Sequence, residues 1–378
     1  MLDYEALRLI WWALLGALLI GFAITDGFDL GVGTIFRFVG RTDEERRALL
    51  ASVEPVWEGN QVWFILGGGA AFAAWPLLYA ASFSGLYLAM FLVLVAFILR
   101  PVGFTFRDKL PDPRWRNLWD WALLIGGGVP ALLFGVAFGN LFLGLPFHFD
   151  ELMRPIYTGG FFGLLRPFAL LVGLVSLAML IMHGATYAAL KVGEPMSQRA
   201  ARVGQVAAWA YVVLFIAAGT WLAFGVTGER VVAGIHPAGP SNPIGKSVEL
   251  VRGGWLDNFR AHAALWTVPA TALLAALATG LLLGARRAGA AFLTSSLAQA
   301  GTILTAGIGL FPFLMPSSTQ PDQGLTVWDA SSSARTLLIM LVAVIIFLPI
   351  VLIYTSWVFR VLKGRITLEE LRGRHSSY

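Results

Sequence analysis

The chain of 378 residues is 57% hydrophobic and only 13% charged, whereas about a quarter of the residues in a typical soluble domain are charged. A soluble protein of this length would fold into two or three domains, and it would have too little interior for so many apolar side chains. The formal net charge of +5 does not indicate nucleic-acid binding, because the basic residues cluster at the ends of apolar segments. The absence of cysteine excludes disulfides, thiolate metal ligands and iron–sulfur clusters. The composition therefore predicts an integral membrane protein.

Apolar segments long enough to cross a bilayer follow one another along the chain. Residues 59–99 form a run of 41 residues without Lys, Arg, Asp or Glu, and residues 288–321 form another of 34, where about 20 suffice for one membrane helix. We predict an all-α protein, a single polytopic domain over residues 1–378, with about nine transmembrane helices. Their approximate bounds are 8–28, 57–75, 78–99, 119–141, 163–189, 204–226, 262–284, 289–314 and 336–359. The first is interpreted as a retained span, because the residues before it mix acidic and basic side chains and no clear cleavage site follows.

The division between the second and third segments depends on Trp75 and Pro76, because proline cannot donate the helical hydrogen bond and restricts the residue before it. Eight spans plus one re-entrant segment are the alternative. The charges favour nine spans: with the N-terminus on the periplasmic side, the inner segments would hold 19 of the 27 Lys and Arg residues and the outer segments 8. This topology places the C-terminus in the cytoplasm. The longest outer segments would be residues 227–261 and 315–335, which are rich in Gly, Pro, Ser and Asn.

Carboxylates at membrane depth are the main functional candidates, because a charge there is costly unless it faces protein or water. They are Asp26, Asp29, Glu54, Glu58 and Asp120. The first two share one helical face, as do the two glutamates, and the predicted topology places all five near the cytoplasmic boundary. With Asn60 and Gln61 beside them, they are candidates for a proton route from the cytoplasm. Alternatively they are interfacial: Asp120 would cap its helix, and Glu54 would lie in the headgroup region.

Of the five histidines, only His183 lies well inside a predicted span. Met179 is four residues before it, and His and Met can ligate haem iron. Two ligands on one face of one helix cannot reach opposite sides of a porphyrin, so we interpret His183 as an interhelical hydrogen-bonding residue and predict no haem or metal site in this chain. Trp57 and Trp63, which lie with Glu58, are candidates for lining a quinone or gas passage, or for anchoring their helix in lipid.

Several long motifs are distinctive. They include Gly-Phe-Ala-Ile-Thr-Asp-Gly-Phe-Asp-Leu-Gly-Val-Gly from residue 21, Trp-Glu-Gly-Asn-Gln-Val-Trp from residue 57, Arg-Pro-Val-Gly-Phe from residue 100 and Leu-Phe-Pro-Phe-Leu-Met-Pro-Ser-Ser from residue 310. In content and order, these motifs resemble subunit II of the cytochrome bd-type quinol oxidases. The resemblance implies two four-helix bundles plus one peripheral helix, in a bacterial inner-membrane heterodimer with a subunit I. That partner would hold two haems b, one haem d and the quinol site.

The resemblance also implies a function. The complex would be a terminal oxidase that oxidises quinol and reduces dioxygen to water, and it would contribute to the proton-motive force without pumping. This chain would have no catalytic residue of its own; it would stabilise subunit I and contribute a proton route. A bound quinone, lipid and a small single-helix subunit are further candidate partners.

The sequence departs from the family pattern at two positions. Glu58 stands where relatives often have Asp, and Thr105 stands where some have a carboxylate, for which Asp108 lies near enough to substitute. Asp108 therefore joins the candidates for the proton route. Two other functions fit nine spans with intramembrane carboxylates: a secondary transporter, and a scaffold that only anchors its partner.

Overall fold

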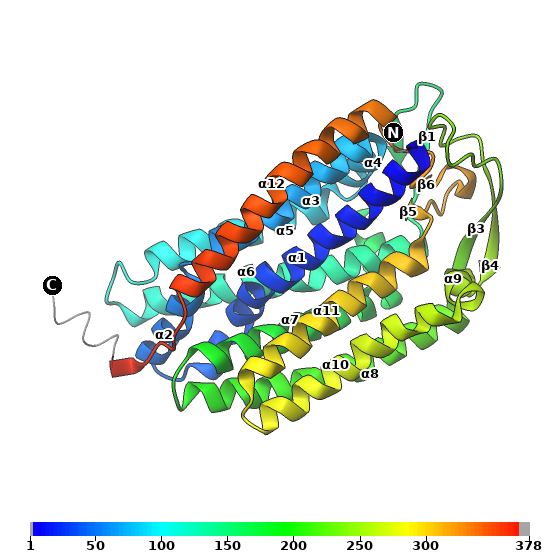
Figure 1. Cartoon of the computed structure of the whole chain (residues 1–378). Coiled ribbons are helices and arrows are strands. Elements are labelled where there is room, and N and C mark those ends of the chain that lie inside the picture. Colours follow the sequence, from blue (N-terminus) through cyan, green and yellow to red (C-terminus); the bar gives the residue numbers. More distant parts are fainter. Residues whose placement is uncertain (1–2, 370–378) are drawn as a thin grey trace.

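The computed structural model describes residues 3–369, and the fold is built from long helices (Figure 1). Within these residues, eight helices are each long and apolar enough to cross a membrane, and a bent pair of helices makes nine if the pair forms one span. The eight are α1 (Tyr4–Val39), α5 (Tyr87–Phe106), α6 (Pro113–Leu143), α7 (Pro167–Lys191), α8 (Met196–Gly225), α10 (Thr267–Gly284), α11 (Ala288–Leu310) and α12 (Ala334–Val361). The predicted all-α membrane fold is therefore confirmed.

Helix α1 begins at Tyr4, four residues before the predicted span, and ends much later than predicted. The Asp3 side chain accepts a hydrogen bond from the backbone N–H of Ala6 (2.7 Å) and so caps the helix. The prediction ended this span at residue 28, whereas the helix continues to Val39. At a rise of 1.5 Å per residue its 36 residues extend about 54 Å, longer than a hydrocarbon core of about 30 Å. Asp26 and Asp29 therefore lie within the helix rather than at its end.

The bent pair consists of α3 (Trp57–Ala74) and α4 (Pro76–Gly85), whose axes differ by 119°. The break falls at Trp75, as the proline that follows predicted. The prediction was wrong about what comes next, because residues 76–85 turn aside as α4 and the next span is α5, which starts at Tyr87 rather than at residue 78. Helix α4 packs on strand β2 (Pro155–Tyr157) at the end of the molecule that carries the strands.

The membrane helices pack in two groups. In one, α7, α8, α10 and α11 each contact the next and close into a ring. In the other, α1 contacts α3 and α6, α5 contacts α6, and the Phe64 and Phe97 rings join α3 to α5 at 5.5 Å. The two groups meet where α1 and α6 pack on α7. Helix α12 lies outside both groups and contacts α1 and α3.

The contact between α1 and α7 depends on two glycines. A Cβ atom added to Gly31 would lie 2.1 Å from the carbonyl oxygen of Leu180, and one added to Gly184 would lie 2.4 Å from the carbonyl carbon of Gly31. Only glycine allows two helix backbones to approach this closely. This contact fixes which face of α1 points toward α7 and which toward the other helices.

Three two-stranded antiparallel hairpins gather at the end near the N-terminus (Figure 1). They are β1 (Phe147–Phe149) with β2, β3 (Thr227–Ala233) with β4 (Ser247–Arg252), and β5 (Phe313–Met315) with β6 (Leu325–Thr326). The second hairpin and the short α9 (Asp257–Ala261) occupy the predicted outer segment 227–261. We call this end the hairpin end.

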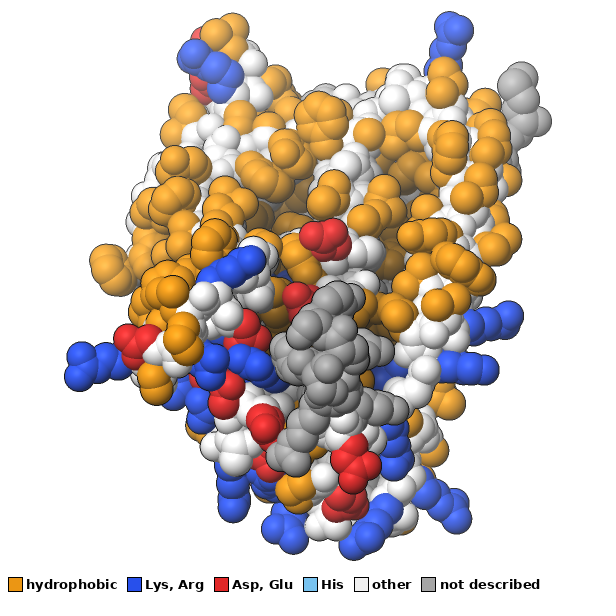
Figure 2. Space-filling model, turned by 90° about the vertical axis from the view of Figure 1, so that its left-hand side faces the viewer, with side chains coloured by type: hydrophobic (Ala, Val, Ile, Leu, Met, Phe, Trp, Pro, Cys, Tyr) orange, Lys and Arg blue, Asp and Glu red, His pale blue; other side chains and the backbone are white. Residues whose placement is uncertain are grey.

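The opposite end carries the short helix α2 (Asp43–Val53), and we call it the α2 end. Thr42 and Glu45 form a capping box at the start of α2, and the Glu45 carboxylate also pairs with Arg199. The charged side chains gather over the lower part of the view in Figure 2, and hydrophobic side chains cover most of the rest. This distribution is typical of a membrane protein whose charges lie at the water boundary.

Candidate functional site

A buried ion pair joins α1 to α5 inside the first helix group. The Arg100 guanidinium donates to both carboxylate oxygens of Asp26, at 2.8 and 3.1 Å. Asp26 is fully buried and Arg100 is 3% exposed. Two parallel N–H···O bonds satisfy both oxygens and hold the two side chains in one geometry. Asp26 is therefore held in a bidentate ion pair with Arg100.

Asp29 lies on the same face of α1 but has different partners. Its Oδ2 atom accepts a hydrogen bond from the Asn60 amide of α3 (2.8 Å), and both side chains are buried. Its other oxygen, Oδ1, is buried and has no hydrogen-bond partner among residues 3–369. A buried carboxylate with a free oxygen is costly unless it is protonated or meets water. Of the three buried candidate carboxylates Asp26, Asp29 and Asp120, Asp29 alone keeps an oxygen without a partner among the described residues.

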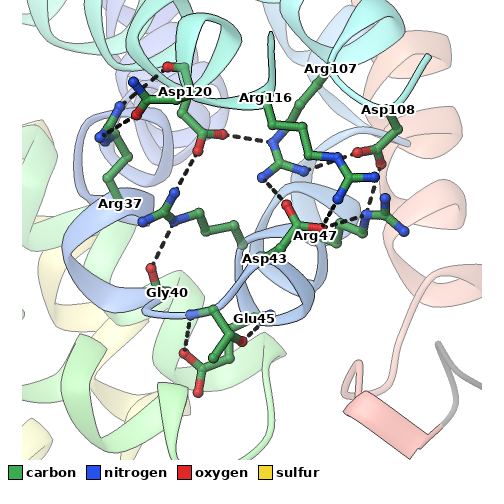
Figure 3. A network of polar contacts seen from close by, with 12 residues as sticks. Arg37, Gly40, Asp43, Glu45, Arg47, Arg107, Asp108, Arg116 and Asp120 are labelled. Atoms are coloured by element: carbon green, nitrogen blue, oxygen red, sulfur yellow. Dashed lines mark hydrogen bonds and ion pairs between the residues drawn. The ribbon is translucent and has the colours of Figure 1, made fainter. Parts of the chain in front are cut away.

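Asp120 belongs to a network of ion pairs at the α2 end (Figure 3). One of its oxygens pairs with Arg107 and the other with Arg46, both at 2.7 Å. Arg107 and Arg116 also pair with Asp43, the first residue of α2 (2.8 and 3.0 Å). The alternative that Asp120 caps its helix is wrong, because α6 begins at Pro113 and is capped by Asp112. Asp120 instead fastens α2 and the end of α5 to α6.

Asp108 and Glu54 lie between helices at the same end. Asp108 is about half exposed and pairs with Arg107 (3.0 Å) and Arg47 (3.2 Å). Glu54 follows α2 directly; partial burial raises the pKa of its carboxyl, and the neighbouring Asp108 carboxylate raises it further. Glu54 is the water-side carboxyl that precedes α3.

Glu58 is exposed on α3. The same face carries apolar side chains that are also exposed, including Val62, Ile65 and Phe72. Gln61 is half-buried, whereas Asn60 and Trp63 point into the protein. Glu58 is thus a carboxyl in the first turn of α3, on the outward face that carries exposed apolar side chains.

Both tryptophan candidates pack against neighbouring helices. Trp63 packs on α1, where a Cβ atom at Gly21 would lie 2.4 Å from its ring. Trp57 stacks on Phe104 of α5, with the Arg100 guanidinium 5.8 Å from its ring centroid. Both tryptophans therefore serve contacts between helices, and Trp57 shields one side of the buried ion pair.

His183 is held by hydrogen bonds on both sides of its ring. Its Nδ1 atom bonds to the Ser295 hydroxyl of α11 (2.7 Å), and Nε2 bonds to the Ile24 carbonyl of α1 (2.9 Å). Since both nitrogens are engaged, neither is free for iron, and the residues do not fit a haem. No group of three or more His, Asp or Glu side chains in the described part of the chain could hold a metal ion.

A large apolar cavity of about 820 Å³ lies in the half of the molecule toward the hairpin end. It is lined by residues of α1, α3, α4, α6 and α11, with the Gly67, Gly68 and Gly69 backbone on one side and aromatic side chains such as Phe72 and Phe83 on another. Its volume is in the range of small-molecule sites, about 300–1,000 Å³. Trp57 and Trp63 are not among its lining residues.

The sequence interpretation missed the arginines that complete these sites. Arg100, Arg107 and Arg46 were counted only as topology charges, yet each pairs with a buried aspartate. The sequence did contain a signal for Arg100: it directly follows the 41-residue uncharged run, so its side chain starts at membrane depth, where a charge needs a partner. Nothing local indicated which carboxylate each arginine would meet.

Known proteins resemble this chain along its whole length. Residues 7–362 match the family described as cytochrome bd terminal oxidase subunit II. The chain is 50% identical over 379 residues to cytochrome bd-I ubiquinol oxidase subunit 2 of Escherichia coli K12, and 48% identical to a probable cytochrome oxidase subunit 2 of Haemophilus influenzae; each alignment covers both proteins completely. Cytochrome bd ubiquinol oxidase subunit 2 of Bacillus subtilis is 29% identical over 96% of the chain and 97% of the relative.

A solved structure has the same fold. A chain in the structure of bd oxidase from Geobacillus thermodenitrificans superposes with a TM-score of 0.67 and 17% identity, covering 94% of this chain and 98% of that one. The match to the family and the identity to its curated members agree with the motifs around Asp26, Asp29 and Asn60. The chain therefore belongs to the family of cytochrome bd terminal oxidase subunit II proteins.

Proposed function

We propose that this chain stabilises the haem-bearing subunit I of its oxidase and conducts protons toward it from the α2 end. Family membership makes the chain a subunit of a quinol-oxidising terminal oxidase. In the proposal the active site, with two haems b and one haem d, belongs to subunit I, and the complex lies in the bacterial inner membrane. The α2 end faces the cytoplasm, as the excess of Lys and Arg on that side predicts.

The single observation that carries the proposal is the position of Glu58. A carboxyl on a lipid-facing surface costs several kcal/mol, and Glu58 lies exposed among apolar side chains of α3. That cost disappears if another protein covers this face. Subunit I is the expected cover, and Glu58 then lies at the boundary between the two subunits.

The other candidates divide by their partners. Asp26 and Asp120 are held by arginines, so protonating either would break a buried ion pair. They serve as structural anions, and Asp108 serves with them at the α2 end. Asp29 has a free oxygen and is linked through Asn60 to α3, the helix that carries Glu58.

The proposed route therefore runs along α3 from the water side. Glu54 lies at the α2 end, Glu58 follows four residues later, and Asn60 and Gln61 lie beyond it. Burial and the Asp108 carboxylate raise the pKa of Glu54, so its carboxyl holds a proton more readily than an ordinary glutamate does. Asp29 is the buried proton acceptor beside this path. Oxygen reduction takes its protons from the cytoplasm, and quinol is oxidised on the outer side. The complex thereby contributes to the proton-motive force without pumping.

The large apolar cavity supports a second element of the proposal. A quinone has a long apolar tail and a small polar ring, and the cavity between α1, α3, α4, α6 and α11 is apolar and of suitable volume. We assign this cavity, rather than Trp57 and Trp63, as the quinone candidate of the chain.

The test is Glu58→Gln in the intact two-subunit oxidase. Glutamine keeps the size and hydrogen bonding of the side chain but cannot carry a proton, so we expect oxygen consumption to fall by about ten-fold or more while the haem absorbance stays unchanged. Asp29→Asn should slow turnover in the same way. Glu249→Gln, on an exposed strand at the hairpin end, is the matched control and should keep full turnover.

Two results would overturn the proposal. Normal turnover and an unchanged pH profile in Glu58→Gln would reduce the chain to a scaffold that only anchors its partner. Purification of the chain without a haem-bearing subunit would favour a transporter instead.

A further inference from the structure

A second cavity, of about 550 Å³, opens between α1, α7, α11 and α12 near the α2 end. Its walls are aromatic and aliphatic. Phe28 and Tyr187 are stacked with ring centroids 3.9 Å apart, and Phe292 and Phe359 lie 6.1 and 6.2 Å from Phe28. The walls are thus a packed aromatic surface contributed by four helices.

Three cations form the edge of this cavity on the α2 side: Lys191, Lys363 and Arg365. Lys191 ends α7, and its Nζ atom donates to the Leu362 carbonyl (2.6 Å), while its own carbonyl accepts from the Ile366 N–H (2.7 Å). These bonds hold the segment after α12 against α7 and so place the other two cations at the cavity edge. Among residues 3–369, no carboxylate forms an ion pair with any of the three.

Helix α12 is packed more tightly in its first half than in its second. Its buried residues are Leu337 and Leu341, both in the first turns at the hairpin end. The half that follows, down to Val361, borders the cavity through Phe359 and has no buried residue. Something apolar must fill the space, since neither an empty cavity of this size nor water against these aromatic walls would be favourable.

The chemistry of the site restricts the occupant. The cavity is apolar and lies within the membrane-spanning segments, and its edge toward the predicted cytoplasm carries three cations that have no ion pair among residues 3–369. An extended peptide segment would leave backbone N–H and C=O groups unsatisfied against these walls, because only a helix satisfies them internally. A quinone has no charge for three cations to bind, and free phosphate has nothing to place in the cavity. An anionic phospholipid fits both parts.

We infer that this cavity is a binding site for an anionic phospholipid of the cytoplasmic leaflet. One acyl chain fills the space between α12 and the α1–α7–α11 surface, and the headgroup phosphate lies at Lys191, Lys363 and Arg365. The lipid thereby fills the gap between the loosely packed second half of α12 and the rest of the subunit. Anionic lipids are enriched on the cytoplasmic side of membranes, which agrees with the topology that the positive-inside rule predicts for the α2 end.

The experiment is native mass spectrometry of the intact oxidase complex, stripped of lipid in detergent and titrated with single lipids. Phosphatidylglycerol and phosphatidylcholine with the same acyl chains are compared, so that the tails match and only the headgroup charge differs. Each basic side chain near an anionic headgroup contributes roughly a five-fold factor in affinity. In the variant Lys363→Gln/Arg365→Gln we therefore expect phosphatidylglycerol binding to weaken by about 25-fold, toward the level of phosphatidylcholine.

Two further variants keep the result specific. Arg286→Gln/Arg287→Gln removes two exposed cations from the turn between α10 and α11, also at the α2 end but away from the cavity, and should retain full affinity. Leu190→Trp fills the cavity from α7 and should weaken the binding of both lipids. Soluble glycerol phosphate should not compete, because it lacks the acyl chain.

Several outcomes would overturn the inference. They are equal affinity for the two lipids, an equal loss of affinity in the Arg286/Arg287 control, or competition by glycerol phosphate at the concentration of the lipid. The mass spectrum could instead show a bound quinone. If that quinone stays bound in the Lys363→Gln/Arg365→Gln complex, the cavity is a quinone site.

Discussion

Removing Arg100 should test whether the buried ion pair holds the first helix group together. In Arg100→Leu the Asp26 carboxylate would remain fully buried without its bidentate partner. Deleting one member of a buried pair costs about 3–5 kcal/mol, because the remaining charge is left uncompensated. We therefore expect the Tm of the detergent-solubilised complex to fall by roughly 5–10 °C.

The double variant Asp26→Leu/Arg100→Leu separates the charge from the packing. Replacing both members of a buried ion pair with apolar residues is often neutral or stabilising, so the double variant should recover most of the loss. Arg286→Leu, in the exposed turn after α10, is the control for removing a positive charge and should shift the Tm by less than about 1 °C.

The assay is thermal unfolding followed by intrinsic tryptophan fluorescence, with the haem spectrum as the check on assembly. The reasoning would be refuted if Arg100→Leu lost less than about 1 kcal/mol. It would also be refuted if the double variant were as unstable as Arg100→Leu alone, since the loss would then come from the packing of Arg100 on Trp57 and Phe97.

Three further predictions concern other parts of the fold. Gly31→Ala should destabilise the complex by about 1–3 kcal/mol because α1 and α7 would be pushed apart. Gly16→Ala is the control, since a Cβ atom at Gly16 would have no atom within 4 Å, and it should be neutral or stabilising in the same thermal assay. Burial raises the pKa of Glu229 at the hairpin end to about 8 from 4.5, so its contribution to stability should fall as the pH rises from about 4.5 through 8. A Tm measured at pH 5 and pH 9 should show this decline in the wild type, and the decline should be smaller in Glu229→Gln. Burial raises the pKa of Glu45, but hydrogen bonds from Arg199 and from two backbone N–H groups outweigh burial and lower the pKa overall. The stabilisation by Glu45 should therefore be lost as the pH falls below 4.5. In Glu45→Gln, the Tm should depend less on pH in this acidic range.

The membrane class and most of the spans could be predicted from the sequence because they depend on local properties. A run of apolar residues long enough to cross a bilayer does so wherever its neighbours lie, and a proline breaks a helix whatever packs on it, as at Trp75 and Pro76. The motifs around Asp26, Asp29 and Asn60 also indicated the correct family. The predicted end of the first span was wrong because it treated Asp26 and Asp29 as the edge of the membrane.

The roles of the individual carboxylates could not be predicted in this way, because each role depends on a partner from a distant segment. Asp26 and Arg100 are 74 residues apart, and Asp29 and Asn60 are 31 apart. Hydropathy places a residue at a depth in the membrane, but it does not set the rotation of its helix about the axis. That rotation is set by long-range packing, such as the contact between Gly31 of α1 and Gly184 of α7. Only the assembled helices decided that Asp26 faces an arginine, that Asp29 keeps a free oxygen, and that Glu58 faces outward.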